Sequence, residues 1–300
     1  MPKIRIAALD LDGTLLSHEN TITPRTRQAI AEAAARGVVV LPATGRALAS
    51  LPPLVAQLPG VRYAITSNGA AVWDLGEDPL AAVYSRYSDA AARRTCEPVC
   101  LIRQVFPAEK AREVFALYQE FAGSLSVFSD GMVIRDHLAQ ERMGERQRRL
   151  LSLSTEAKQP NDGRFHIVRD TAEWMSRNAH AIEKFCMFFE DAAQAQAALP
   201  RFYALKDVEV VQGSPDNIEV TARGVDKGSA LLALADHLGV AHAATLAVGD
   251  SDNDRAMLEK AGVAAVMANG MERVKQLADI VSENDCDHDG VAEIFARLSV

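Results

Sequence analysis

The chain has 300 residues, 48% of them hydrophobic, with 32 basic and 40 acidic residues and a formal net charge of −8. This composition supplies a sizeable core and excludes a disordered chain, and the acidic balance argues against nucleic acid or an anionic membrane as a partner. A length near the upper limit of a single core favours two domains.

Cysteine usage and hydropathy predict the cellular setting. The four cysteines are scattered and show no Cys-x2-Cys spacing, which is typical of reduced thiols; they are Cys96, Cys100, Cys186 and Cys286. No signal peptide precedes the first apolar run, and no apolar run approaches the ~20 residues that a membrane span needs. We therefore expect a soluble, cytoplasmic protein with no membrane partner.

The first apolar run, residues 4–9, is a predicted strand that ends in two aspartates, Asp10 and Asp12. Residues i and i+2 of a strand face the same side, so both carboxylates are expected to point towards one site. Gly13 and Thr14 then turn the chain, with side chains small enough for backbone amides to approach an anion. Two close carboxylates stay ionised most easily beside a cation, and Mg2+ is the usual partner of such oxygen ligands. Taken alone, this stretch is also compatible with a plain Asp-Gly turn after a core strand.

Helices and strands alternate up to residue 87. A helix is expected from residue 23, strands at residues 38–41 and 63–66, and a hairpin around residues 76–79 with its second arm at residues 82–84. The alternation implies a parallel sheet, and ligands bind at the carboxyl edge of such sheets. Two further polar segments, Ala43-Thr44-Gly45-Arg46 and Ser67-Asn68-Gly69-Ala70, fall at that edge.

From about residue 88 to residue 222 the pattern becomes rich in strands, which predicts an inserted α+β domain. We expect a hairpin turn at residues 129–131, a heavily charged helix at residues 139–150 and a loop at residues 155–163. The mixed charges of that helix favour a solvated face over an anion-binding patch. Weak candidates for contacting a substrate are Asp216, Asn217, Glu219 and Arg46.

The alternation of helix and strand returns after residue 222. A helix is expected from Asp226 to residue 238, and strands at residues 243–248, 263–267 and 278–281, before a closing helix from Gly290. The first of these strands ends in Gly-Asp-Ser-Asp-Asn-Asp, residues 249–254.

Six side chains at these strand ends and loops suit phosphoryl transfer, which needs in-line placement and charge neutralisation. Asp10 is the candidate nucleophile and Asp12 the candidate acid/base. The Thr44 hydroxyl would hold a phosphoryl oxygen, and Lys227 would neutralise that oxygen and the nucleophile. Asp250 offers a further metal ligand, and Asp254, one helical turn later, would orient Asp250, Lys227 or a bound water.

Each of these residues also has a structural explanation when taken alone. Thr44-Gly45 and Asn68-Gly69 are turn signals, Lys227 could lie on the surface, and Asp250 and Asp254 could be acids that favour a helix N-terminus. Their coincidence at the carboxyl ends of predicted parallel strands favours the catalytic interpretation.

Six segments together resemble the haloacid dehalogenase-like superfamily, specifically its Cof-type phosphatases (type IIB, with a C2 cap). They are Asp-Leu-Asp-Gly-Thr (10–14), Ala-Thr-Gly-Arg (43–46), Ser-Asn-Gly-Ala (67–70), Gly-Val-Asp-Lys-Gly (224–228), Gly-Asp-Ser-Asp-Asn-Asp (249–254) and Asn-Asp…Asp-Gly-Val (284–291). The resemblance covers essentially the whole chain, in order and at family-like spacing.

The resemblance implies an α/β fold: a Rossmann-like three-layer core with a parallel sheet, residues 1–87 and 223–300, and an α+β cap inserted at residues 88–222. It also implies an aspartyl-phosphate on Asp10, protonation of the leaving group by Asp12, and Mg2+ held by Asp10, the backbone carbonyl of Asp12 and Asp250, with Asp254 behind them. We assign phosphate or substrate contacts to Gly13, Thr14, Gly45, Arg46, Asn68, Gly69 and Asn253.

Three stretches depart from the family pattern. Residues 86–104 have no obvious counterpart and are expected to lengthen the strand that enters the cap. Residues 268–270, Ala-Asn-Gly, replace a common Gly-Asn pair, and Cys286-Asp287-His288 lengthens the loop between Asn284 and Gly290.

The expected activity is therefore Mg2+-dependent hydrolysis of a small phosphate monoester, such as a sugar phosphate. A sugar phosphomutase that uses the same nucleophile is the alternative, and strong activation by a sugar bisphosphate would favour it. A non-catalytic sensor of phosphorylated metabolites would have lost a nucleophile or a metal ligand, and no such loss is visible.

Overall fold

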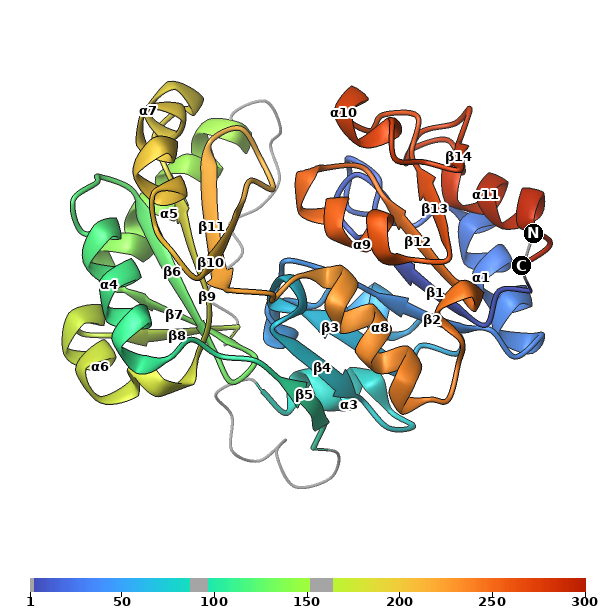
Figure 1. Cartoon of the computed structure of the whole chain (residues 1–300), viewed down its shortest axis with the longest axis horizontal. Coiled ribbons are helices and arrows are strands. Elements are labelled where there is room, and N and C mark those ends of the chain that lie inside the picture. Colours follow the sequence, from blue (N-terminus) through green and yellow to red (C-terminus); the bar gives the residue numbers. More distant parts are fainter. Residues whose placement is uncertain (1–2, 87–96, 152–163) are drawn as a thin grey trace.

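The structure, a computed structural model, describes residues 3–86, 97–151 and 164–300, apart from the side chains of residues 147–151. Two lobes lie side by side in Figure 1: the first contains both ends of the chain, and the second contains its middle part. Cys96 and the loop expected at residues 155–163 lie outside the described residues.

A five-stranded parallel sheet of order β14-β13-β12-β1-β2 forms the centre of the first lobe. Its strands are β1 (Ile6–Leu9), β2 (Val39–Pro42), β12 (Thr245–Gly249), β13 (Val263–Val266) and β14 (Ile280–Val281). All neighbours in this sheet are parallel. Parallel sheets are buried on both faces and are built from continuous apolar runs, which is why the sequence predicts these strands. The expected α/β core with a parallel sheet is confirmed.

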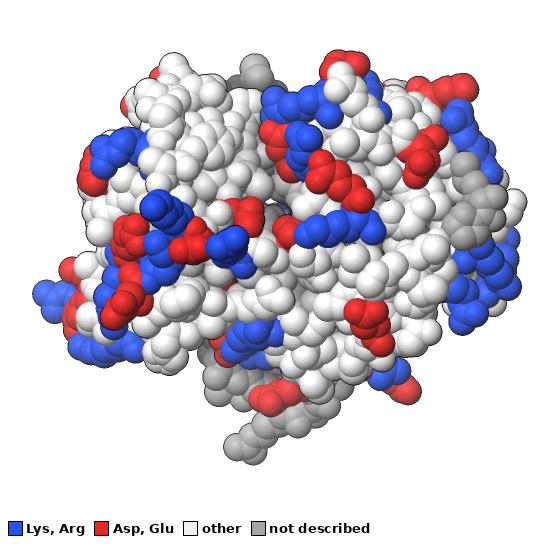
Figure 2. Space-filling view, viewed as in Figure 1, with Lys and Arg blue, Asp and Glu red and all other residues white. Residues whose placement is uncertain are grey.

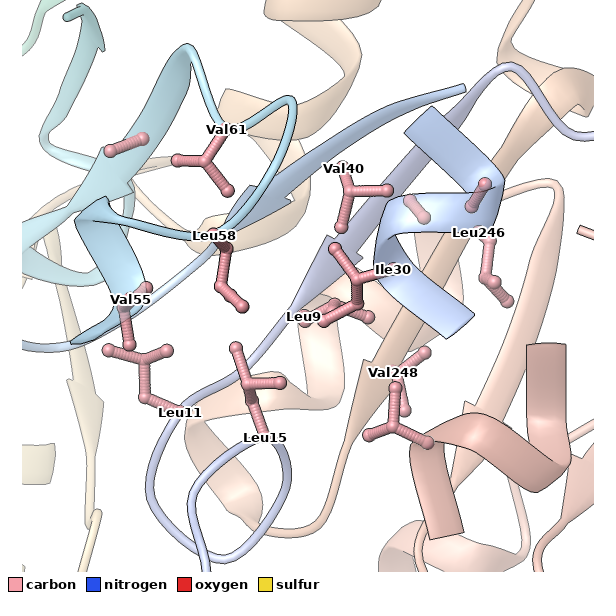
Figure 3. Packing of buried hydrophobic residues seen from close by; sticks show 14 of the residues in the cluster. Leu9, Leu11, Leu15, Ile30, Val40, Val55, Leu58, Val61, Leu246 and Val248 are labelled. Carbon is pink, nitrogen blue, oxygen red and sulfur yellow. The ribbon is translucent and has the colours of Figure 1, made fainter. Parts of the chain in front are cut away.

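Helices cover both faces of this sheet (Figure 1). The helices of the first lobe are α1 (Pro24–Ala35), α2 (Pro53–Ala56), α3 (Pro79–Tyr84), α8 (Lys227–His237), α9 (Arg255–Lys260), α10 (Glu272–Lys275) and α11 (Gly290–Leu298). Ala7 and Leu9 of β1 share a buried cluster with α1 and α11, part of which Figure 3 shows. Ile6 and Ala8 belong to the cluster of the opposite face, with α8 and α9. Strand β1 is therefore held from both sides, and its carboxyl end is fixed in space.

A three-stranded antiparallel sheet of order β3-β4-β5 extends the first lobe. Its strands are β3 (Tyr63–Thr66), β4 (Ala71–Asp74) and β5 (Val99–Arg103). A parallel bridge between Ala43 and Ile65 joins β3 to the end of β2. The hairpin expected around residues 76–79 is wrong, because residues 79–84 form α3. Asp78 accepts a hydrogen bond from the amide of Ala81 at 3.0 Å, and Pro79 takes the first helical position, so this helix-start signal outweighs the turn signal.

The second lobe contains a separate six-stranded sheet of order β10-β11-β9-β6-β7-β8, in which only the β7–β8 pair is parallel. The elements of this lobe are α4 (Ala108–Tyr118), β6 (Ser124–Ser129), β7 (Met132–Asp136), α5 (His137–Leu151), β8 (Phe165–Val168), α6 (Thr171–Asn178), β9 (Ile182–Phe188), α7 (Ala192–Tyr203), β10 (Val208–Val211) and β11 (Asn217–Ala222). The hairpin turn at residues 129–131 and the helix over residues 139–150 are confirmed. The sequence does not predict β8, a four-residue edge strand with little burial, or the short α6.

The six-stranded sheet begins at residue 124, well after residue 88, where the inserted domain was expected to begin. The intervening β5 pairs with β4 of the first lobe, with Ile102 opposite Val72. The described part of residues 86–104 thus adds a strand to the first lobe, where the sequence suggested a longer entry into the cap.

The β6–β7 turn rests against the first lobe at Gly131. The carbonyl of Gly131 accepts a hydrogen bond from the amide of Ala49 at 2.9 Å, and a Cβ on Gly131 would lie 3.0 Å from the Trp73 ring. Arg86 and Arg103 place their guanidinium carbons 4.8 Å and 5.5 Å from the centroid of the same ring. A buried tryptophan therefore marks one end of the contact between the lobes.

No helix among the described residues has the length and apolar character that crossing a bilayer requires. On the face shown in Figure 2, basic and acidic side chains are intermixed.

Phe185 is fully buried in the core of the second lobe, with its ring centroid 5.5 Å from Phe106, 6.4 Å from Phe115 and 5.9 Å from Tyr118. Phe185→Ala is expected to lower the free energy of unfolding by about 3–5 kcal/mol, because it leaves a cavity among these rings. Urea denaturation followed by circular dichroism measures this. The exposed Tyr203 provides the control, since Tyr203→Ala should change stability by less than about 0.5 kcal/mol. Equal losses for the two variants would contradict the assignment of Phe185 to the core.

Candidate active site

Asp10 directly follows β1 at the carboxyl edge of the parallel sheet. Its amide donates to the carbonyl of Val248 in β12 at 2.9 Å, and its carbonyl accepts from the amide of Leu15 at 3.2 Å. Gly13 makes the turn between them possible with φ +84°, and a Cβ there would lie 2.7 Å from Asp250 Oδ2. The Asp10 side chain is therefore held in a fixed, buried position, with 4% of the residue exposed.

Lys227 is the positive charge of this site. Its Nζ lies 2.6 Å from Asp10 Oδ1 and 2.7 Å from Asp254 Oδ1, and the whole side chain is buried. The preceding Asp226 caps α8 by accepting a hydrogen bond from the Ser229 amide at 2.7 Å, so the start of the helix fixes Lys227. Burial alone would lower the pKa of Lys227, but the two carboxylates outweigh it and the pKa is raised. The side chain therefore stays an ammonium.

Asp250 and Asp254 come from the loop after β12. Asp254 Oδ2 accepts hydrogen bonds from the amides of Asp250 at 2.9 Å and Ser251 at 3.1 Å, while its Oδ1 pairs with Lys227. Asp250 Oδ1 accepts from the hydroxyl of Thr14 at 2.9 Å. Asp254 thus orients both the backbone of Asp250 and the ammonium of Lys227.

Asp10, Asp250 and Asp254 form a cluster that fits a hard divalent cation. One carboxylate oxygen from each lies within 4.8 Å of the others. Burial, together with the charge of Asp254, raises the pKa of Asp10 well above its usual value and that of Asp250 to about 7. Buried carboxyl groups this close to one another are hard to ionise without a compensating positive charge. A donor set made only of oxygens suits Mg2+. Because both oxygens of Asp254 are engaged, Asp10 and Asp250 are the better candidate ligands.

Asp12 does not join this cluster through its carboxylate. Its side chain is exposed and receives a two-pronged contact from Arg46, with Nε 2.9 Å from Oδ2 and Nη2 close to Oδ1. The sequence argument assumed that the strand continues through Asp12, but β1 ends at Leu9 and Asp12 lies in the turn that follows. The alternation of side chains therefore no longer applies at this position.

The segments after β2 and β3 meet next to this cluster. The Thr44 hydroxyl accepts from the amide of Arg46 at 3.1 Å, and the Thr44 carbonyl accepts from the amide of Asn68 at 3.1 Å. Gly69 has φ +97°, and a Cβ there would lie 2.2 Å from the carbonyl oxygen of Asp226, beside Lys227. Glycine is required at this close approach, which brings the Asn68 turn against the start of α8.

The second lobe reaches the same place with a buried ion pair. Lys184 Nζ, on β9, lies 2.9 Å from Glu219 Oε2 on β11 and donates to the carbonyl of Gly45 at 2.5 Å. Glu219 Oε2 also accepts from Asn68 Nδ2 at 2.5 Å. The other amide atom, Asn68 Oδ1, is buried without a hydrogen-bond partner in the described structure. An orphaned acceptor between the lobes is suited to a ligand that donates a hydrogen bond.

Sequence reasoning proposed Glu219 as a weak candidate and missed Lys184 and Glu183. Glu183 is fully buried and accepts from the Ser67 hydroxyl at 3.0 Å, so it also connects the lobes. The available signal was two adjacent charges inside the apolar run of β9, since buried charges are rare unless they are paired.

The remaining candidates are distributed around the junction of the lobes. Asn253 accepts from the Ser251 hydroxyl at 2.8 Å, and a Cβ on Gly213 would lie 3.5 Å from Asn253 Nδ2, so the loop before β11 approaches it. Asn217 Nδ2 donates to Glu219 Oε1 at 3.2 Å, whereas Asp216 pairs with Arg146. The surface is indented where the two lobes meet (Figure 2).

Comparison with known proteins identifies relatives along nearly the whole chain. A sequence model of the haloacid dehalogenase-like hydrolases matches residues 7–92 and 97–295. The 5-amino-6-(5-phospho-D-ribitylamino)uracil phosphatase of Bacillus subtilis is 27% identical over 290 residues, which is 97% of this chain and 94% of that protein. The HMP-PP phosphatase of Serratia proteamaculans is 30% identical over 275 residues, 91% of this chain and 87% of that protein.

A solved structure of a haloacid dehalogenase-like hydrolase from B. subtilis has the same fold. It superposes with a TM-score of 0.79 at 24% identity, over 98% of this chain and all of that one. The resemblance predicted from the six sequence segments is confirmed.

The raised pKa of Asp250 predicts how pH affects Mg2+ binding. With the pKa raised to about 7, the metal-free Asp250 holds a proton over part of the neutral range, and Mg2+ must displace it. We expect the affinity for Mg2+ to fall by at least about tenfold per pH unit below 7, because the pKa of Asp10, the other proposed ligand, is also raised. Calorimetric titration between about pH 6 and pH 8 measures this. An affinity that does not change with pH would contradict a protonated Asp250.

The same shift affects the stability of the metal-free protein. The carboxyl of Asp250 binds its proton more tightly in the folded than in the unfolded chain, so folding is favoured at low pH and loses this contribution as the pH rises towards 7. Asp250→Asn removes the titrating group. It should make the profile of melting temperature against pH flatter between about pH 4 and pH 7. Thermal melts in EDTA test the prediction, and an unchanged profile would contradict it.

Proposed function

Because this chain belongs to the haloacid dehalogenase-like hydrolase family, we propose that it hydrolyses small phosphate monoesters through an aspartyl-phosphate on Asp10. Its enzyme class is that of phosphoric monoester hydrolases, and the relatives named above are phosphatases. One observation carries the mechanism: a buried carboxylate, a fixed ammonium and a hard oxygen ligand converge in Asp10, Lys227 and Asp250. The cytoplasmic location stays a prediction.

In the proposed first step, a carboxylate oxygen of Asp10 bonds to the phosphorus while the bond from phosphorus to the ester oxygen breaks. Asp12 gives its proton to that leaving oxygen. Asp12 suits this role because it is exposed two residues after the buried nucleophile. Arg46 contacts both of its oxygens, so this contact must open for Asp12 to take up and deliver the proton.

In the proposed second step, the oxygen of a water molecule bonds to the phosphorus and its proton passes to Asp12. The bond between phosphorus and Asp10 breaks, which releases inorganic phosphate and restores both carboxyl groups. The same residue therefore acts as acid and then as base.

Charge neutralisation is the main contribution of the remaining residues. Lys227 opposes the charge of Asp10 and of a phosphoryl oxygen, and the Thr44 hydroxyl donates to another. We propose that Asp10, the backbone carbonyl of Asp12 and Asp250 hold Mg2+, which supplies a divalent charge beside the transferred group. The other contacts to phosphate or substrate are assigned to Gly13, Thr14, Gly45, Arg46, Asn68, Gly69 and Asn253.

We further propose that the six-stranded lobe is a cap that selects the substrate. Its separate sheet supports the division into a core of residues 1–87 and 223–300 and a cap within residues 88–222, with β5 on the core side. Lys184 and Glu219 reach from this lobe to Gly45 and Asn68. The substrate class proposed is a small phosphorylated metabolite whose hydroxyl or amino group meets this polar junction.

Hydrolysis of a chromogenic aryl phosphate tests the mechanism, with Mg2+ and with EDTA. Asp10→Asn should lower kcat about 10^4-fold or more, because the nucleophile is lost. Asp12→Asn should lower it about 10^2–10^4-fold, because it removes the acid and base. EDTA should abolish the activity of the unmodified protein.

A matched control is Asp207→Asn, which alters an exposed ion pair with Arg223 on the second lobe. Asp207 has φ 59°, a conformation that asparagine also tolerates, so this variant should keep full activity. Hydrolysis that survives Asp10→Asn in pure protein would exclude the mechanism.

A further inference from the structure

A second group of metal-ligand side chains lies outside the carboxylate cluster. It consists of His18, from the turn after β1, and of Cys286 and Asp287, from the loop before α11. One ligand atom of each lies within 4.8 Å of the others. His18 Nδ1 is 3.7 Å from Cys286 Sγ and 2.6 Å from Asp287 Oδ2.

These distances are close to those of a tetrahedral zinc site. With metal–sulfur and metal–nitrogen bonds of about 2.3 Å and 2.0–2.1 Å, the two ligand atoms lie about 3.6 Å apart. The separation of Cys286 Sγ and His18 Nδ1 already matches this value. Asp287 Oδ2 would move from its hydrogen bond with His18 to roughly 3.3 Å from the same nitrogen. The side chains of His18 and Asp287 are more exposed than Cys286, which is buried and sets the position, so the small shift would fall on Asp287 Oδ2.

We propose that His18, Cys286 and Asp287 bind a thiophilic divalent cation of the zinc class. A thiolate, an imidazole and a carboxylate form a softer ligand set than the carboxylates around Asp10, and such a set selects Zn2+ over Mg2+. Three protein ligands leave a fourth position for water or an external ligand. The inference rests on this geometry alone and does not depend on the proposed phosphatase mechanism.

Local hydrogen bonds hold the ligands in place before a metal arrives. The amide of His18 donates to Asp287 Oδ1 at 2.9 Å, which joins the two segments through one backbone contact. The amide of Cys286 donates to Asn269 Oδ1 at 3.2 Å, and Asn269 Nδ2 donates to the carbonyl of Gly13 at 2.7 Å. A metal at this position would therefore fasten the loop before α11 to the turn that carries Asp10 and Gly13.

Metal binding must displace protons here. Burial raises the pKa of the Cys286 thiol to about 11, so the thiol is protonated in the metal-free protein near neutral pH. The bond to the metal forms as the thiol proton leaves to solvent, and the imidazole gives up any proton that its contact with Asp287 stabilises.

Titration of the 300-residue protein, freed of zinc-class metals, with Co2+ tests the proposal, because a cysteine thiolate bound to Co2+ absorbs strongly in the near ultraviolet. With Mg2+ in excess to occupy the carboxylate cluster, we expect this band to saturate at one equivalent of Co2+ and to be bleached by Zn2+. Cys286→Ser should abolish this band. His18→Gln, which changes an exposed side chain, should weaken Co2+ binding at least about tenfold and leave the melting temperature of the metal-free protein unchanged.

Two controls separate this site from other thiols and from the carboxylate cluster. Cys100→Ser should keep the band, because Cys100 lies on β5, where its thiol donates a hydrogen bond to the carbonyl of Ile102. Asp10→Asn should also keep it, since carboxylate ligands do not give a thiolate band. A protein without the band, a band that does not saturate at one equivalent, or a band that survives Cys286→Ser would overturn the proposal.

Discussion

The arrangement of side chains at the carboxyl edge of the central sheet depends on one buried ammonium group, that of Lys227. Lys227 lies between Asp10 and Asp254, and without it two carboxylates would be buried within a few ångströms of each other with no opposing charge. The fold surrounds this contact with rigid structure: β1 and β12 fix Asp10, the start of α8 fixes Lys227, and two backbone amides fix Asp254. The remaining excess of negative charge falls on Asp10 and Asp250, where a cation is expected.

The sequence predicts this part of the molecule well because its signals are local. Strands such as β1 and β12 are continuous apolar runs. Each is followed directly by small and polar residues, and this change in residue type marks the end of the strand. The relation between Asp10 and Lys227, which are far apart in the chain, was inferred from the charge that phosphoryl transfer must neutralise and from the family resemblance. The parallel topology does not give it, because Lys227 follows β11 of the six-stranded sheet. The Asp12 carboxylate was misplaced, because strand alternation was extended into a turn.

Features that depend on three-dimensional pairing were harder to predict. Residues 79–84 have an apolar pattern that suits a strand or a helix, and the capping by Asp78 decided the outcome. Lys184 and Glu219 become a pair only because β9 and β11 are neighbours, and the charges inside β9 do not reveal which residue of another strand pairs with them. His18 and Cys286 come from opposite ends of the chain, and no spacing rule would have joined them.

The contact between the lobes contains two kinds of polar group, and this difference has a consequence for motion. Around Trp73, the exposed Asp130 pairs with Arg86 and Arg103. Beside Gly45 and Asn68, the polar partners from the second lobe are the buried Lys184 and Glu219. Water replaces exposed ion pairs at little cost, whereas buried hydrogen bonds are lost unless water or a ligand takes their place. Separation of the lobes would therefore be limited by how easily water or a ligand enters beside Gly45 and Asn68.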